Sequence, residues 1–156
     1  MAKRILSDQD YQLLAAFRLA MRQFITFSEE AARKSGLTPR QHQALLGIKG
    51  AQNGGGANIA DLASFLIIRH NSAVELVDRL VRAGFVERLN DVSDRRRVLV
   101  GLTPKGERQL ANLSAIHLAE IDRIGPELNK LLTIMTKARK RGAVASKCPS
   151  GTKLGL

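Results

Sequence analysis

Three consecutive arginines, Arg95 to Arg97, are the residues of this chain best suited to bind a polyanion. They follow Asp94 in a connector between two short apolar segments, 84–89 and 98–102, which have the pattern of antiparallel strands. Three adjacent cations repel one another, and the nearby acids offset little of that cost. An arginine in a narrow DNA minor groove gains from the focused negative potential, and a neighbouring carboxylate can orient its guanidinium. We therefore interpret Asp94, Arg95, Arg96 and Arg97 as the nucleic-acid-binding tip of a hairpin.

The helix expected over 69–83 has one apolar and one polar face. At 100° per residue, its core face consists of Ala73, Leu76, Val77 and Leu80. A major groove accepts an α-helix, and residues near the start of that helix reach the base edges. The candidate contacts are Arg69, Asn71, Ser72, Glu75 and Arg79, with His70 as a secondary contact. His70 projects between Val77 and Val81, which favours a partly packed side chain, and the acids Glu75 and Asp78 also fit an ordinary solvated face.

The remaining segments determine how these two groups of residues are positioned. Helices are expected over 8–34, 39–50 and 59–65, with a capping box at Thr38 and Gln41 and a cap at Asn58. A further helix follows Thr103, is interrupted at Gly125-Pro126, and resumes to residue 136. The two strands of the hairpin have no expected partner strand elsewhere. A helix followed by a β-hairpin is the order of a winged helix-turn-helix.

We therefore expect a single, mainly α domain over 1–156 with a small β-hairpin wing. The winged helix DNA-binding lobe spans 37–103, and the N- and C-terminal helices, 8–34 and 104–136, form a helical dimerisation lobe. Each of these long helices has an apolar stripe that the rest of a single chain is too small to cover. This predicts that the helices pair with those of a second copy in a homodimer. The segment 137–156 is rich in Lys, Arg, Gly and Ser and is expected to be a disordered basic tail.

The charge favours a polyanionic partner. Among 156 residues, 25 Lys and Arg against 14 Asp and Glu give a net charge of +11, with a pI near 10.7. Charge alone fits both nucleic acid and an anionic membrane surface, but no apolar run approaches the length of a membrane span. The first ten residues turn polar before any apolar segment forms, which predicts a cytoplasmic location. The single cysteine, Cys148, cannot form an internal disulfide.

Patterns for catalysis or cofactor binding are absent from the sequence. The three histidines, His42, His70 and His117, are too dispersed to form a local metal motif, so no metal or other cofactor is expected. His42 is interpreted as packed or as lining a ligand crevice. Gly54 to Gly56 lack the Lys and Ser/Thr of a phosphate-binding loop, and no Ser/His/Asp or paired-carboxylate arrangement can be argued. The chain is therefore not expected to be an enzyme.

Several of these motifs together resemble the MarR family of bacterial transcriptional regulators. The most specific is Asp94-Arg95-Arg96, then a strand, then Leu102-Thr103-Pro104-Lys105-Gly106; 37–41, 59–63 and 77–80 agree as well. The resemblance implies a homodimeric winged helix-turn-helix protein that usually represses transcription and often releases DNA on binding a small molecule. By this match Arg96 enters the minor groove, Asp94 orients it, and 69–72 begin the recognition helix; the spacing also allows Arg95 or Arg97 at the tip.

The sequence thus predicts a regulator that binds a pseudo-palindromic operator in double-stranded DNA. We expect it to be a repressor that is released by a small apolar or phenolic anion bound between the two lobes. The alternative is an architectural protein that coats DNA without sequence preference through its basic tail and wing.

Overall fold

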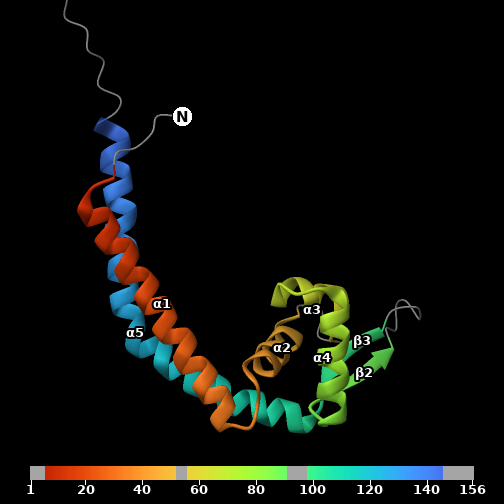
Figure 1. Cartoon of the computed structure of the whole chain (residues 1–156). Coiled ribbons are helices and arrows are strands. Elements are labelled where there is room, and N and C mark those ends of the chain that lie inside the picture. The colour runs from red at the N-terminus through yellow and green to blue at the C-terminus, as the bar shows by residue number, and fades with distance from the viewer. Residues whose placement is uncertain (1–5, 52–55, 91–97, 146–156) are drawn as a thin grey trace, which may run out of the picture. The chain divides into compact units, whose positions relative to one another are not determined.

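The computed structural model of the protein describes residues 6–51, 56–90 and 98–145. Its elements follow the order α1 (Asp8–Lys34), α2 (Pro39–Gly50), β1 (Ala57–Asn58), α3 (Ile59–Leu66), α4 (His70–Arg82), β2 (Val86–Asn90), β3 (Val98–Leu102) and α5 (Pro104–Ala145), as Figure 1 shows. The chain divides into two compact units. Unit 1 combines 1–25 with 120–156, and unit 2 is the continuous segment 26–119.

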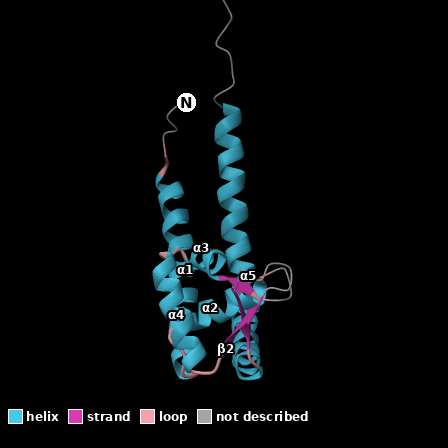
Figure 2. Cartoon of the chain, turned by 90° about the vertical axis from the view of Figure 1, so that its right-hand side faces the viewer, coloured by secondary structure: helices cyan, strands magenta, loops and turns pink. Residues whose placement is uncertain are grey.

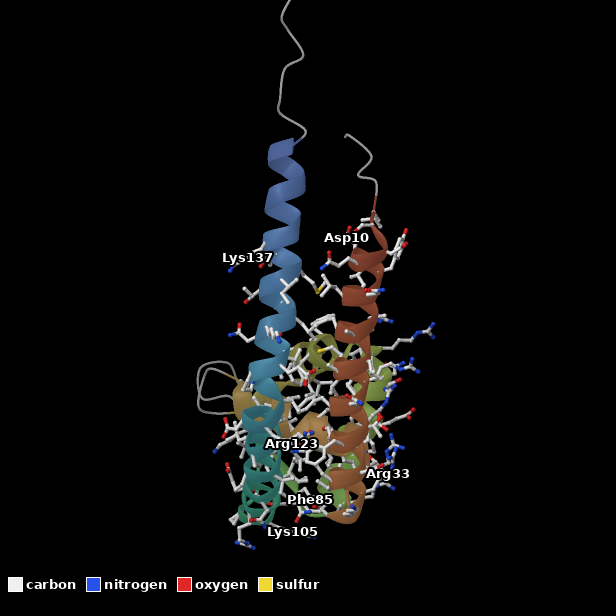
Figure 3. The ribbon with its side chains drawn as sticks, turned by 90° about the vertical axis from the view of Figure 1, so that its left-hand side faces the viewer. Asp10, Arg33, Phe85, Lys105, Arg123 and Lys137 are labelled. Atoms are coloured by element: carbon white, nitrogen blue, oxygen red, sulfur yellow. The ribbon has the colours of Figure 1, made fainter. Side chains whose placement is uncertain are left out.

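Unit 1 consists of the first part of α1 and the last part of α5, which lie side by side (Figure 3). Helix α1 begins with a reciprocal cap, in which the Asp10 backbone N–H donates to Ser7 Oγ and the Ser7 N–H donates to the Asp10 carboxylate. Within 6–25 and 120–137, no residue of unit 1 is buried within the chain. The apolar side chains on these helices therefore gain little burial from one copy of the protein.

Helix α5 differs from the sequence-based expectation in two ways. It continues through Gly125-Pro126, where we expected an interruption, and it runs to Ala145, past the expected boundary at 136. A proline removes one backbone hydrogen bond but leaves the turns on either side intact, and apolar residues repeat at helical spacing before and after Pro126. The expected disordered tail is therefore helical over 137–145, and 146–156 lie outside the described residues.

The helices of unit 2 begin where the sequence predicts. The capping box at α2 is confirmed: the Gln41 N–H donates to Thr38 Oγ1 over 3.2 Å, and the Thr38 N–H donates to Gln41 Oε1 over 2.9 Å. The cap at α3 is confirmed as well, because the Asp61 N–H donates to Asn58 Oδ1 over 2.8 Å. These caps satisfy backbone donors that would otherwise lack a partner at the helix starts.

The sheet has three strands rather than the two of an isolated hairpin (Figure 2). Strand β3 lies in the middle, antiparallel to β2 on one side and to the two-residue β1 on the other. Two residues are too few to produce a periodic pattern, so the sequence did not indicate β1. Gly56, at φ +113°, permits the close approach, because a Cβ there would lie 2.5 Å from the Val100 carbonyl oxygen.

One hydrophobic core in unit 2 joins the helix-turn-helix, the sheet and the start of α5. Its largest fully buried side chains are Leu45, Leu62, Leu80, Leu113, Val77, Val86 and Val100. The predicted core face of α4 is confirmed, since Ala73, Leu76, Val77 and Leu80 are all buried. The opposite face of α4 is consequently free to present its polar side chains to solvent.

Candidate nucleic-acid interface

All six candidate contact residues at α4 are exposed. Arg69 is the N-cap residue and makes no side-chain cap hydrogen bond, and α4 itself begins at His70. The exposed members of the set are Arg69, His70, Asn71, Ser72, Glu75 and Arg79. Asn71, Ser72, Glu75 and Arg79 lie opposite the buried face of the same helix, so the core fixes the direction in which they point, whereas Arg69 and His70 are exposed at the start of α4.

His70 is exposed, and the expectation that it is partly packed was wrong. It is the first residue of α4, and helical side chains tilt toward the N-terminus of their helix. No earlier turn of α4 lies beside the His70 side chain to cover it, which accounts for its exposure. Helical periodicity gives the side of a helix that a residue occupies, but it does not give this end effect.

The structure pairs one of the two acids on α4 with a cation. The Arg88 guanidinium on β2 donates to Asp78 Oδ1 over 2.7 Å, and both side chains are about two-fifths exposed, at 43%. In the sequence, Asp78 favoured an ordinary solvated helix face over a DNA-binding face, because a free carboxylate repels phosphate. The ion pair offsets that charge locally. Sequence reasoning missed Arg88, because no local pattern indicates which β2 residue faces α4.

The predicted tip of the wing, Asp94, Arg95, Arg96 and Arg97, lies outside the described residues. The base of the wing is described, and its outermost pair is Asn90 opposite Val98. The antiparallel pair on either side of the expected connector is confirmed, and β2 includes Asn90, one residue beyond the expected strand 84–89.

A set of contacts holds the base of the wing to the end of α4. The Thr103 hydroxyl donates to the Gly84 carbonyl over 2.7 Å, and the Thr103 N–H donates to the Phe85 carbonyl over 3.0 Å. Lys105 donates to the Ala83 carbonyl over 2.8 Å, and its ammonium lies 4.5 Å from the centre of the Phe85 ring (Figure 3). The Thr-Pro-Lys-Gly motif thus has a structural role, in which the start of α5 fixes the turn between α4 and β2.

Two histidines that are far apart in sequence meet in the interior of unit 2. The His42 and His117 rings stack with centroids 4.7 Å apart, and the Phe27 ring meets His117 edge-on. His117 Nδ1 lies 2.6 Å from the Leu113 carbonyl oxygen, and its Nε2 lies 2.7 Å from Ser28 Oγ. Since a carbonyl only accepts, Nδ1 of the neutral ring carries the proton and Nε2 accepts from the Ser28 hydroxyl.

Burial, and secondarily the charge of His117, lower the pKa of His42. Both effects favour the neutral ring. The expectation that His42 is packed is confirmed, as it is only 5% exposed. Among the described residues no three His, Cys, Asp or Glu side chains are grouped in a way that could hold a metal ion. The histidine pair therefore connects α1, α2 and α5 within unit 2.

A concave site lies beside the exposed face of α4. This pocket, of about 430 Å³, is bounded by the end of α1, the start of α2 and one side of α4. Glu29, Thr38, Arg40, Leu76 and Arg79 are among its lining residues. Arg79 thus belongs both to this pocket and to the exposed face of α4.

The fold and the exposed face of α4 define a winged helix-turn-helix transcriptional regulator. Residues 35–97 match the sequence model of the MarR family. The chain is also 30% identical over 132 residues to the uncharacterised HTH-type transcriptional regulator YkoM of Bacillus subtilis, covering 78% of this chain and 82% of that protein. The chain therefore belongs to the MarR family of DNA-binding transcriptional regulators.

Solved structures share this fold. AbsC, a MarR family transcriptional regulator from Streptomyces coelicolor, is 24% identical with a TM-score of 0.67, over 93% of this chain and 99% of that chain. A variant of MepR from S. aureus, bound to an oligodeoxyribonucleotide, is 20% identical with a TM-score of 0.59, over 85% of this chain and 95% of that chain. This fold and family are those of regulators rather than enzymes. Within the described ranges, no helix is both long and apolar enough to cross a membrane.

Proposed function

We propose that the protein binds a pseudo-palindromic DNA operator as a homodimer and acts as a repressor. The start of α4, with Arg69 to Ser72, Glu75 and Arg79 exposed, enters the major groove and reads base edges. Arg96 in the wing enters the adjacent minor groove, with Asp94 as its orienting partner. The observation that carries this proposal is the exposure of six candidate contacts, four of which, Asn71, Ser72, Glu75 and Arg79, lie opposite the buried face of one helix.

The oligonucleotide-bound MepR variant, which shares the fold, supports DNA as the ligand. The net charge of +11 favours the same ligand. Counterion release makes such binding fall steeply with salt concentration. The contacts to base edges, rather than those to phosphate, give the specificity that a regulator needs.

The homodimer is proposed from the apolar side chains that the chain itself leaves uncovered. Tyr11 and Leu19 on α1 are 59% and 57% exposed, and Ile121 and Leu132 on α5 are each 45% exposed. Burying such side chains against a second copy stabilises both chains. Sedimentation equilibrium tests this step: Leu19→Glu should shift the protein toward monomer, while the adjacent Arg18→Gln, which changes the net charge by the same one unit, serves as the charge control. A Leu19→Glu protein as dimeric as the wild type would contradict the proposed interface.

Release from DNA is proposed to follow binding of a small aromatic carboxylate or phenolate. The pocket beside α4 contains two cations, Arg40 and Arg79, and an apolar contact from Leu76. Arg79 also lies on the exposed face of α4 that we propose contacts DNA. An anion bound to its guanidinium therefore competes with DNA phosphate for that charge. Calorimetry with a panel of aromatic carboxylates and phenolates, with and without operator, tests this role. Equal ligand affinity in the presence and absence of operator would contradict it.

Selection of bound sequences from a randomised duplex pool at about physiological salt tests the proposed regulator directly. Enrichment of an inverted repeat supports a dimeric, sequence-specific regulator. Tight binding without enrichment supports instead an architectural protein that coats DNA.

Substitutions then locate the interface on the selected operator. Arg69→Ala and Arg96→Ala should each cost about 1–3 kcal/mol of operator binding and relax base preference at one position. Arg108→Ala, at an exposed arginine on α5 outside both proposed contact sets, removes the same charge and serves as the matched control. The control should weaken all duplexes slightly and equally. Unchanged binding by Arg96→Ala would contradict the wing assignment.

A further inference from the structure

The turn between α3 and α4 places an isoleucine where folding gains nothing from it. Ile67 is 91% exposed, and its backbone has φ +53° and ψ +49°. It is the only non-glycine residue with positive φ among the described residues. The left-handed region favours glycine at the end of a helix and is unfavourable for a β-branched side chain, at a cost of about 1–3 kcal/mol.

The surrounding backbone holds Ile67 in this conformation. Its N–H donates to the Ser64 carbonyl over 3.2 Å, and the Ile68 N–H donates to the Ala63 carbonyl over 3.0 Å. These two bonds close the end of α3 and direct the chain into α4 (Figure 1). The side chain consequently projects into solvent and buries almost no apolar surface. Strain and exposure at the same residue suggest a role other than folding.

Ile67 lines an open groove of about 730 Å³ together with the first residues of the recognition helix. The apolar part of the groove comes from Ala63, Ile67 and Ile68, and the polar part includes Arg69, His70 and Ser72. The groove is therefore continuous with the face that we propose enters the major groove. It combines an apolar surface with side chains that can bind phosphate or base edges.

Base edges in the major groove carry one apolar group, the 5-methyl group of thymine. An exposed apolar side chain beside Arg69 and His70 matches that group and no other base feature there. We propose that Ile67 packs against the 5-methyl group of a thymine in each half-site and so sets a thymine preference. This inference rests on the proposed function, because it requires α4 to dock in the major groove.

The test uses the full-length protein and Ile67→Gly. Glycine is the residue best suited to the observed backbone conformation, so this variant should fold and melt close to the wild type. Ile67→Asn, which also tolerates that conformation, is a second variant that adds a polar group. Leu46→Ala is the matched control, because Leu46 is an exposed apolar residue, at 45%, on α2 and does not line the groove.

Parallel selections from a randomised pool should enrich thymine at one half-site position for the wild type and Leu46→Ala, but not for Ile67→Gly or Ile67→Asn. Replacing that thymine by deoxyuridine removes only the methyl group. A buried methyl-sized group is worth about fourfold in affinity per half-site, or about 15-fold for both half-sites of a dimer. The wild type should lose this factor and Ile67→Gly should not.

A thymine preference that is retained by Ile67→Gly, or a wild type that does not distinguish thymine from deoxyuridine, would overturn the inference. Failure of the proposed function has a different signature, since the wild type would then not distinguish operator from scrambled duplex. Sedimentation of the free proteins tests whether this surface instead contacts a second copy of the chain. If Ile67→Gly lowers the oligomeric state and leaves base preference unchanged, the surface contacts a second copy of the chain and the inference is wrong.

Discussion

Substituting Gly106 by alanine should destabilise the protein through a contact that cannot relax. A Cβ at this position in α5 would lie 2.1 Å from the Phe85 carbonyl oxygen, 3.1 Å from its carbon and 3.5 Å from Leu102 Cδ2. The nearest atom is backbone, and that carbonyl already accepts the Thr103 N–H over 3.0 Å. The turn between α4 and β2 or the start of α5 must therefore move.

The size of the effect follows from three terms. Overpacking costs about 1–3 kcal/mol, and weakening of the Thr103–Phe85 hydrogen bond adds about 0.5–1.5 kcal/mol. Alanine is favoured over glycine in a helix interior, which returns about 0.5–1 kcal/mol. The net loss is about 0.5–4 kcal/mol, which lowers the melting temperature of a chain of this size by about 1–16 °C.

Gly50→Ala is the matched control for this change. Gly50 ends α2, and a Cβ there would meet no atom within 4 Å. The same chemical change should therefore leave stability unaltered or raise it by up to about 1 kcal/mol. Urea and thermal unfolding should be compared at one protomer concentration, because association links stability to concentration.

Opposite signs for the two variants would support the close approach of α5 to the turn before β2. The reasoning would be refuted if Gly106→Ala were as stable as the wild type, or if Gly50→Ala lost as much stability. Operator binding by Gly106→Ala, measured well below its melting temperature, should also weaken, because the same turn carries the base of the wing.

Three further predictions concern unit 2. Burial and the charge of His117 lower the pKa of His42 below its ordinary value of 6.5, so the unfolded chain takes up the proton more readily than the folded one. The unfolding free energy should therefore be retained above pH 6.5 and fall as the pH drops below that value. In urea titrations, His42→Phe should reduce this dependence of stability on pH. Thr38→Ala removes the cap of α2 and should cost about 1 kcal/mol in the same assay, whereas a loss near zero would mean that the cap contributes nothing. A double-mutant cycle on Asp78 and Arg88 should give a coupling of at most about 1 kcal/mol, because both side chains are 43% exposed; a much larger coupling would contradict this treatment as a solvated pair.

Much of the secondary structure could be predicted because local rules determine it. Thr38 with Gln41, and Asn58 with Asp61, mark helix starts by hydrogen bonds that span three residues. The repeat of Ala73, Leu76, Val77 and Leu80 likewise identifies the buried face of α4. Charge and the Asp-Arg-Arg and Leu-Thr-Pro-Lys-Gly motifs indicated DNA and the family without any tertiary information.

Local rules failed where long-range contacts or end effects dominate. Strand β1 exists because Ala57 and Asn58 pair with β3, about forty residues later in the chain. Helix α5 continues through Pro126 although a proline in a helix interior costs about 3 kcal/mol. Because of this penalty, local helix propensity predicts an interruption there. His70 is exposed because it begins its helix, which periodicity alone does not register.

The sequence by itself determined the starts and caps of α2 and α3, the core face of α4 and the basic character that favours DNA, because each depends on neighbours within a few residues or on composition. Only the tertiary structure decided that Arg88 pairs with Asp78, that His42 stacks on His117, and that Ile67 is held exposed beside Arg69. Each of these relations joins different elements or depends on a backbone conformation fixed by their packing. Chain topology and packing, rather than local sequence pattern, bring such groups together.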